Sequence, residues 1–191
     1  MIGPAAVMRR GANAPLTREI PDLTGVVLGV RFDAGVETVL TDNLVVAVLL
    51  CGPSKKVLSD EHFVFFNQLA TPDMSVRRLE EALGSDRDQI EIDLDAVPDA
   101  VQHIVVVTYV NEGLGLSRTL GRLRRCEIRV LNLNGGVELV RSENLAEGLT
   151  DETGMALGEI YRHQQDWKFR VLGDGYGDGA AGVARDFGVS L

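Results

Sequence analysis

The chain has 191 residues, of which 45% are hydrophobic and 25% charged, a composition typical of soluble globular proteins and not of disordered or fibrous ones. Its length predicts a single domain, residues 1–191, with a core large enough to form without a disulfide or structural metal. The formal charge of −9 disfavours nucleic-acid partners and favours cations. No apolar run approaches the ~20 residues of a membrane helix, so we expect no membrane insertion.

The N-terminal stretch and the two cysteines indicate the compartment. In residues 1–10 the charged residues follow a short apolar stretch, which is the reverse of a secretory signal, so we expect a cytoplasmic protein. Cys51 and Cys126 lie far apart in apolar runs and form no Cys-x-x-Cys motif. We therefore predict two buried free thiols.

Short β-branched runs separated by Gly and Pro predict a chain made mostly of strands. In chain order the predicted strands are residues 25–32, 44–51, 62–68, 89–94, 103–110, 126–133, 137–141 and 168–172. The runs 44–50 and 104–108 are continuously apolar, as buried central strands are, whereas residues 89–94 alternate as a half-exposed strand does. This mixture favours two packed sheets.

Turn and helix signals complete the predicted fold. Residues 132–136, Asn-Leu-Asn-Gly-Gly, predict a hairpin turn between two strands. Residues 75–83 carry apolar side chains at helical spacing before Gly84, and residues 180–187 form a second short helix candidate before Gly188. The predicted fold class is mainly β: a two-sheet β-sandwich with one or two short helices, because no regular βαβ alternation is present.

Two acidic stretches are candidates for a cation site. Residues 80–95 contain seven carboxylates around Gly84, and calcium takes 6–8 oxygen ligands of this kind. The alternative is a solvated loop that leads into a strand with an acidic outer face. The second stretch holds Asp33, Glu37, Asp42 and Asn43. It would share an ion with the first stretch if both loops lie at one end of the sandwich. The alternative is that these Asp and Asn side chains hydrogen-bond their own backbone in turns.

Motifs for catalysis are missing. The sequence contains no His-Glu-x-x-His, Gly-x-Ser-x-Gly or phosphate-binding Gly-Lys-Ser/Thr motif, and the glycines at 177–182 lack the following strand and acid of a dinucleotide site. We therefore predict no catalytic residues and no enzyme. The one basic cluster would receive an acidic partner or serve self-association; it consists of Arg118, Arg122, Arg124, Arg125 and Arg129.

Four segments resemble the TerD family of tellurium-resistance and general stress proteins. They are residues 11–17 (Gly-Ala-Asn-Ala-Pro-Leu-Thr), 59–67, 88–98 (Asp-Gln-Ile-Glu-Ile-Asp-Leu-Asp-Ala-Val-Pro) and 158–176, followed by Asp186-Phe-Gly-Val. The resemblance covers nearly the whole chain. It implies a calcium-binding β-sandwich with acidic loops at one end, no established catalytic reaction, and a role in bacterial cytoplasmic resistance to tellurite and other stresses.

The chain departs from the family pattern at the implied calcium site. Where the family carries Asp-Leu-Asp-Ala, this chain has Asp42-Asn-Leu44-Val, and Leu44 cannot bind a metal. Where the family has a Gly-Asp pair and a denser acidic run, this chain has Val76-Arg-Arg-Leu-Glu and a short loop in which Arg87 would lie beside any ion. The remaining metal-ligand candidates are Asp33, Asp42, Asp86 and Asp88.

Two functions therefore remain open. The first is a non-enzymatic stress-response protein with one weak calcium site. The second is an interaction scaffold of the same family that has lost metal binding and uses an exposed strand edge or the arginine cluster. Both imply protein partners in a stress-response complex and allow a homo-oligomer.

Overall fold

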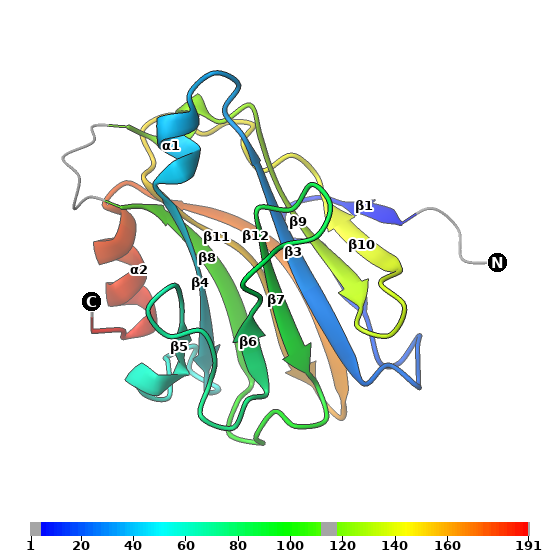
Figure 1. The fold of residues 1–191 in the computed structure, drawn as a ribbon. Helices are drawn as coiled ribbons and strands as arrows, with labels where there is room; N and C mark the ends of the chain where they lie inside the picture. The colour runs from blue at the N-terminus through cyan, green and yellow to red at the C-terminus, as the bar shows by residue number, and fades with distance from the viewer. Residues whose placement is uncertain (1–4, 112–117, 191) are drawn as a thin grey trace.

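The computed structural model describes residues 5–111 and 118–190; residues 1–4, part of the stretch on which the compartment was predicted, lie outside this range. The described residues form two six-stranded sheets with connecting loops and short helices (Figure 1). Sheet A has the order β1 (Ala6–Met8), β10 (Glu138–Ser142), β9 (Arg125–Asn132), β3 (Gly25–Asp33), β7 (Asp88–Asp93), β6 (Val76–Arg78). Sheet B has the order β2 (Asn13–Pro15), β12 (Asp166–Tyr176), β11 (Gly154–His163), β8 (His103–Val110), β4 (Leu44–Cys51), β5 (Phe63–Val64).

The core lies between the two sheets. Sheet A contributes buried side chains such as Leu28 and Ile128, and sheet B contributes Ile104 and Phe169. Because side chains alternate along a strand, the neighbours of these residues point to the outer faces of the sheets. The predicted β-sandwich is confirmed.

Helices and short 3-10 turns occupy the ends and one outer face. They are α1 (Thr38–Asp42), α2 (Gly179–Phe187), η1 (Asp60–His62) and η3 (Leu120–Arg122). Helix α2 packs Val183 and Phe187 against the outer face of sheet B, where they meet Leu49 and Val107. This second apolar cluster explains why the runs 44–50 and 104–108 are continuously apolar, since both of their faces are covered.

The predicted elements differ from the structure at several places, and strands β1, β2 and β11 were not predicted. The helix predicted over residues 75–83 is wrong, because Val76–Arg78 form strand β6, paired antiparallel with β7. The strand predicted over 62–68 is shorter in the structure, Phe63–Val64, and helix α1 was not predicted. The predicted helix over 180–187 and the hairpin turn at 132–136 are confirmed, with Gly188, Gly135 and Gly136 at positive φ.

Both predicted free thiols are confirmed. Cys51 and Cys126 are buried and form no disulfide. Burial raises the pKa of the Cys51 thiol to about 12, and burial also raises the pKa of Cys126. Within residues 5–111 and 118–190, the structure has no helix with the length and apolar character that crossing a membrane requires.

Candidate functional site

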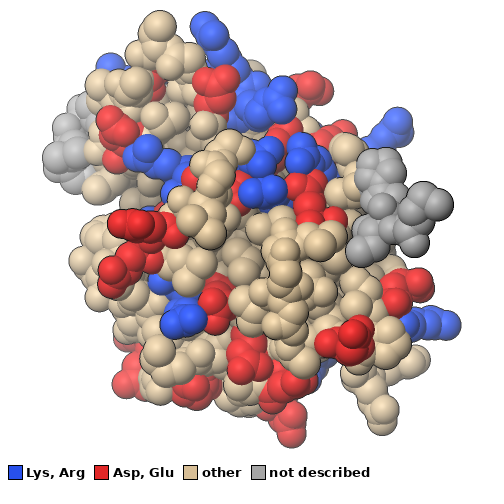
Figure 2. All heavy atoms as spheres, turned by 45° about the vertical axis from the view of Figure 1, so that its right-hand side comes forward, with Lys and Arg blue, Asp and Glu red and all other residues tan. Residues whose placement is uncertain are grey.

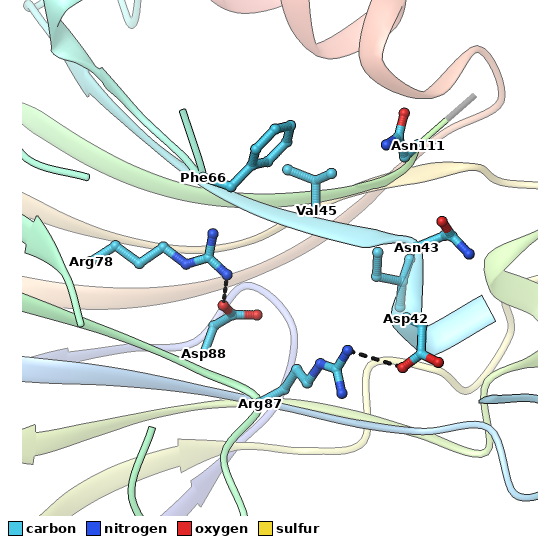
Figure 3. A pocket seen from close by; sticks show the side chains of 9 residues that line it. Asp42, Asn43, Val45, Phe66, Arg78, Arg87, Asp88 and Asn111 are labelled. Atoms are coloured by element: carbon cyan, nitrogen blue, oxygen red, sulfur yellow. Dashed lines mark hydrogen bonds and ion pairs between the residues drawn. The ribbon is translucent and has the colours of Figure 1, made fainter. Parts of the chain in front are cut away.

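A pocket of about 270 Å³ opens between the two sheets at the end that carries α1 (Figure 3). Its wall comes from the end of α1, the start of β4, and strands β6 and β7. The lining residues are Asp42, Asn43, Leu44, Val45, Phe66, Arg78, Arg87, Asp88 and Asn111. Two of the four predicted metal ligands, Asp42 and Asp88, therefore line one pocket, as expected if the loops share an end of the sandwich.

Each of these two carboxylates is paired with an arginine (Figure 3). Arg87 donates to Asp42, with Nη2 and Oδ1 3.2 Å apart, and Arg78 donates to Asp88. Asp88 shares the strand parity of Ile90 and so points toward the space between the sheets, where the side chain of Arg78 meets it. Both arginines lie in stretches that depart from the family pattern described above.

Asp86 lies on the opposite side of sheet A from Asp88. Its carboxylate has no exposed surface and accepts hydrogen bonds from Arg31 Nε at 3.0 Å and Arg129 Nη2 at 2.7 Å. Gln89 Nε2 donates a further bond at 2.7 Å. Since Arg31, Arg129 and Gln89 alternate with core residues, they face outward, and Asp86 cannot share an ion with Asp88.

A glycine makes room for this buried carboxylate. Gly29 lies in β3 between Arg129 of β9 and Gln89 of β7, and a Cβ at this position would run into the carboxylate of Asp86. Asp86 thus packs directly over the backbone of the central strand. The sequence signal for this arrangement was present, because Gly29 interrupts a β-branched run two residues before an arginine, but its meaning depends on strand pairing.

The ion pairs continue across the outer face of sheet A. Arg129 also donates to Glu138 at 2.9 Å, and Arg141 donates to the same carboxylate at 2.5 Å. The hydrogen bond from Arg141, reinforced by Arg129, lowers the pKa of Glu138 to about 2 against the opposing effect of burial. Figure 2 shows basic and acidic side chains side by side in a band across the upper half of the molecule.

The fourth predicted ligand, Asp33, ends strand β3 and does not line the pocket. Its Oδ1 accepts a hydrogen bond from the backbone N–H of Gly35 at 2.7 Å, which is the turn chemistry that we considered as the alternative. The neighbouring Glu37 accepts from Arg118 at 3.3 Å and from Arg122 at 2.6 Å.

These positions bear directly on calcium binding. In the part of the chain that the structure describes, no group of three or more His, Cys, Asp or Glu side chains is arranged to hold a metal ion. Calcium requires several open oxygen donors close together, and here each of Asp42, Asp86 and Asp88 is paired with a guanidinium group. As arranged, the donor set does not fit a calcium ion.

Arginines of the predicted cluster pair with different carboxylates. Arg118 and Arg122 meet Glu37 near α1, whereas Arg129 lies on the outer face of sheet A with Asp86. Sequence reasoning also missed Arg31, which interrupts an otherwise apolar run, and it gave no ion-pair partner to Arg78, which follows Arg77. A charged residue in such a run predicts an internal ion pair only when its partner strand is known.

The fold and the site together define a two-sheet sandwich whose candidate metal-binding end is closed by arginine–carboxylate pairs. The TerD domain model matches residues 5–187, so the chain belongs to the TerD family. It is 32% identical to the tellurium resistance protein TerD of Serratia marcescens over 188 residues, covering 96% of this chain and 97% of the relative. It is 31% identical to general stress protein 16U of Bacillus subtilis (strain 168) over 193 residues, covering 96% and 97%.

A solved structure supports the fold. The crystal structure of a homologue of telluride resistance protein (TerD) from Streptomyces coelicolor A3(2) matches with a TM-score of 0.64 over 85% of this chain and 95% of that chain. Its sequence is 15% identical to this one. The recognised family and the β-sandwich predicted from the sequence are therefore confirmed.

Proposed function

We propose that this TerD-family protein is a non-enzymatic stress-response module in which arginine side chains take the positions that a metal ion would need. In this proposal it acts in a bacterial cytoplasm as an interaction scaffold that binds no metal. The observation that carries it is the pairing of Asp42, Asp86 and Asp88 with arginines, in a partly exposed pair for Asp42 and in buried contacts for Asp86 and Asp88.

The chemistry of the pairs supports this proposal. Asp86 has no exposed surface, and it meets two guanidinium groups and an amide that supply charge-assisted hydrogen bonds. An entering ion would have to break these bonds and leave two cations partly buried. Leu44 adds an aliphatic wall to the pocket where the family resemblance implies a carboxylate.

The sheet edges indicate how such a scaffold would meet its partners. Within the described residues the edge strands β1, β2, β5 and β6 are two or three residues long, and short edges resist pairing with another chain. We therefore assign contact with protein partners, or with a second copy, to the charged faces of the sheets. The net charge of −9 argues against nucleic acid as the partner.

Calorimetric titration of chelator-treated protein with calcium tests the proposal. We expect no binding heat and no rise in melting temperature at millimolar calcium, because only a ligand that binds the native state raises stability. A saturable heat with a thermal shift would contradict the proposal. Magnesium at the same ionic strength is the control for nonspecific screening.

A second candidate function is a single weak calcium site in the pocket of Figure 3. The observation that favours it is that four oxygen-bearing side chains line this pocket: Asp42, Asn43, Asp88 and Asn111. Calcium would then displace Arg78 and Arg87. If calcium does bind, a protein carrying Asp42→Asn and Asp88→Asn must lose the heat, whereas the matched surface variant Asp178→Asn must keep it.

A further inference from the structure

A second cluster of charged side chains lies on sheet B, away from the pocket described above. Glu159 of β11, His103 of β8 and Arg170 of β12 share the outer face, since they alternate with the core residues Ile160, Ile104 and Phe169. Lys55, in the turn after β4, reaches the same carboxylate. One acidic side chain therefore faces three basic ones.

Glu159 holds the three basic groups together from below. Its Oε2 lies 2.9 Å from His103 Nδ1, and its Oε1 lies 3.3 Å from Lys55 Nζ and 3.5 Å from Arg170 Nη1. Burial opposes ionisation, but the hydrogen bond with His103 and the charge of Lys55 outweigh it and lower the pKa of Glu159. The carboxylate is thus an internal anion that orients its neighbours.

Solvent reaches the cations and not the anion. The side chain of Glu159 is 0% exposed, whereas those of Lys55 and Arg170 are 43% and 36% exposed. His103 is 18% exposed, and its Nδ1 is held by Glu159, so Nε2 is the ring nitrogen left for another partner. Lys55 and Arg170 carry two positive charges against one negative charge, and a protonated His103 adds a third.

The ring of Tyr161 packs against two of the basic side chains, Arg170 and His103. The guanidinium of Arg170 lies 4.7 Å from the centre of the Tyr161 ring, and its Nη2 is 3.3 Å from the tyrosine hydroxyl. The ring of His103 lies nearly parallel to the same ring at 6.2 Å. Such packing fixes the direction of the basic groups, and lysine and arginine keep several N–H donors beyond those that Glu159 uses.

We propose that Lys55, His103 and Arg170 form a binding site for a phosphate-type oxyanion on the outer face of sheet B. The site is independent of the metal question, since it shares no residue with the pocket between the sheets. Preorganised N–H donors and a local excess of positive charge are what such an anion requires. This excess stands out on a chain of net charge −9.

A neighbouring cavity limits which charge the rest of the ligand, beyond its phosphate-type group, can carry. A space of about 280 Å³ beside Lys55 has an apolar floor that includes Val105 and Phe187, and its lining also includes Lys56, Asp174 and Asp186. The two carboxylates outnumber Lys56 and would disfavour a second anionic group. The site therefore fits a ligand with one phosphate-type end and a neutral or cationic remainder.

Calorimetric titration with inorganic phosphate tests the site, with sodium chloride at matched ionic strength as the control for screening. We expect saturable heat at millimolar phosphate, a similar response to sulfate, and shifts in the NMR signals of the His103 and Tyr161 rings. Lys55→Gln should weaken binding roughly tenfold, because a hydrogen bond to a charged group contributes on that order. Arg185→Gln, which removes an exposed arginine of α2, should leave binding unchanged.

Two results would overturn the proposal. One is heat with phosphate that does not exceed the heat with chloride. The other is equal phosphate affinity in the wild type and in Lys55→Gln. A second variant, Arg170→Gln, would lose the contact with Tyr161 and could fail to fold, so the result for Lys55→Gln decides. Lys55 is partly exposed, and in Lys55→Gln the buried Glu159 keeps His103 and Arg170 as partners; the melting temperature of the variant, measured beside the titration, establishes that it is folded.

Discussion

Asp86 shows how a single residue can change from a candidate metal ligand to a structural anchor. Its carboxylate is sealed over Gly29 and held by Arg31, Arg129 and Gln89. A buried charge is tolerated only when it is paired and hydrogen-bonded, and both conditions are met here. Removing the carboxylate would leave two guanidinium groups facing each other without their shared anion.

Asp86→Ala should therefore destabilise the protein by about 3 kcal/mol, the low end for breaking a buried ion pair, because Arg31 and Arg129 retain some access to water. Urea unfolding followed by circular dichroism measures this change. Asp178→Ala, which removes an exposed partner of Arg185 at the N-cap of α2, is the surface control and should lower the urea midpoint much less. Equal midpoints for the two variants would show that Asp86 is not an anchor.

Glu138 gives a prediction for the effect of pH. Arg141 and Arg129 lower its folded pKa from 4.5 to about 2, so the ionised form is favoured in the native state. Its stabilisation is therefore fully present above pH 4.5 and is lost as the pH falls toward 2. In urea unfolding between pH 6 and pH 2.5, Glu138→Gln should lose less stability than the wild type. Parallel pH profiles for the two proteins would argue against these pairs.

At the scale of elements, the strands that the sequence predicted best are those buried on both faces, because their apolar pattern reflects burial alone. Residues 44–51 and 103–110 were predicted with their observed bounds, because burial on both faces leaves an unbroken apolar run. The helix predicted over 75–83 failed because three of its residues pair with β7, and pairing between strands overrides a short local pattern. Register cannot be read from one strand alone.

The candidate site was less predictable than the strands for the same reason. The sequence identified Asp42 and Asp88, and the fold brings both to one pocket. It could not show that Asp86 lies on the other side of sheet A, because that depends on which strands flank Gly29. Nor could it show that Arg78 reaches Asp88, since their pairing follows from the register of β6 on β7.

At the scale of the whole molecule, one N-terminal segment closes an edge of both sheets. Residues 6–8 pair with β10 of sheet A, and residues 13–15 pair with β12 of sheet B. Gly11, at φ +80°, lies where the chain crosses between them. Arg10 reinforces the crossing, because its guanidinium donates to the backbone carbonyls of Leu145 and Glu147 at 2.8 and 3.0 Å.

Deleting residues 2–15 should therefore uncover β10 and the long strand β12 together. Both would present unpaired backbone N–H and C=O groups, which are a template for pairing with another chain. We expect the average mass, measured by light scattering after size exclusion, to rise with concentration more steeply than for the full chain. Circular dichroism would establish that the truncated protein keeps its sheet content.

Deletion of residues 2–5 is the matched control, because it leaves both edge strands in place. This shorter deletion should behave like the full chain at every concentration. If the longer deletion also does so, the N-terminal segment does not protect these edges. If only the longer deletion associates, the N-terminal segment protects the edges of both sheets. Partners of the full chain would then contact the faces of the sheets and not their edges.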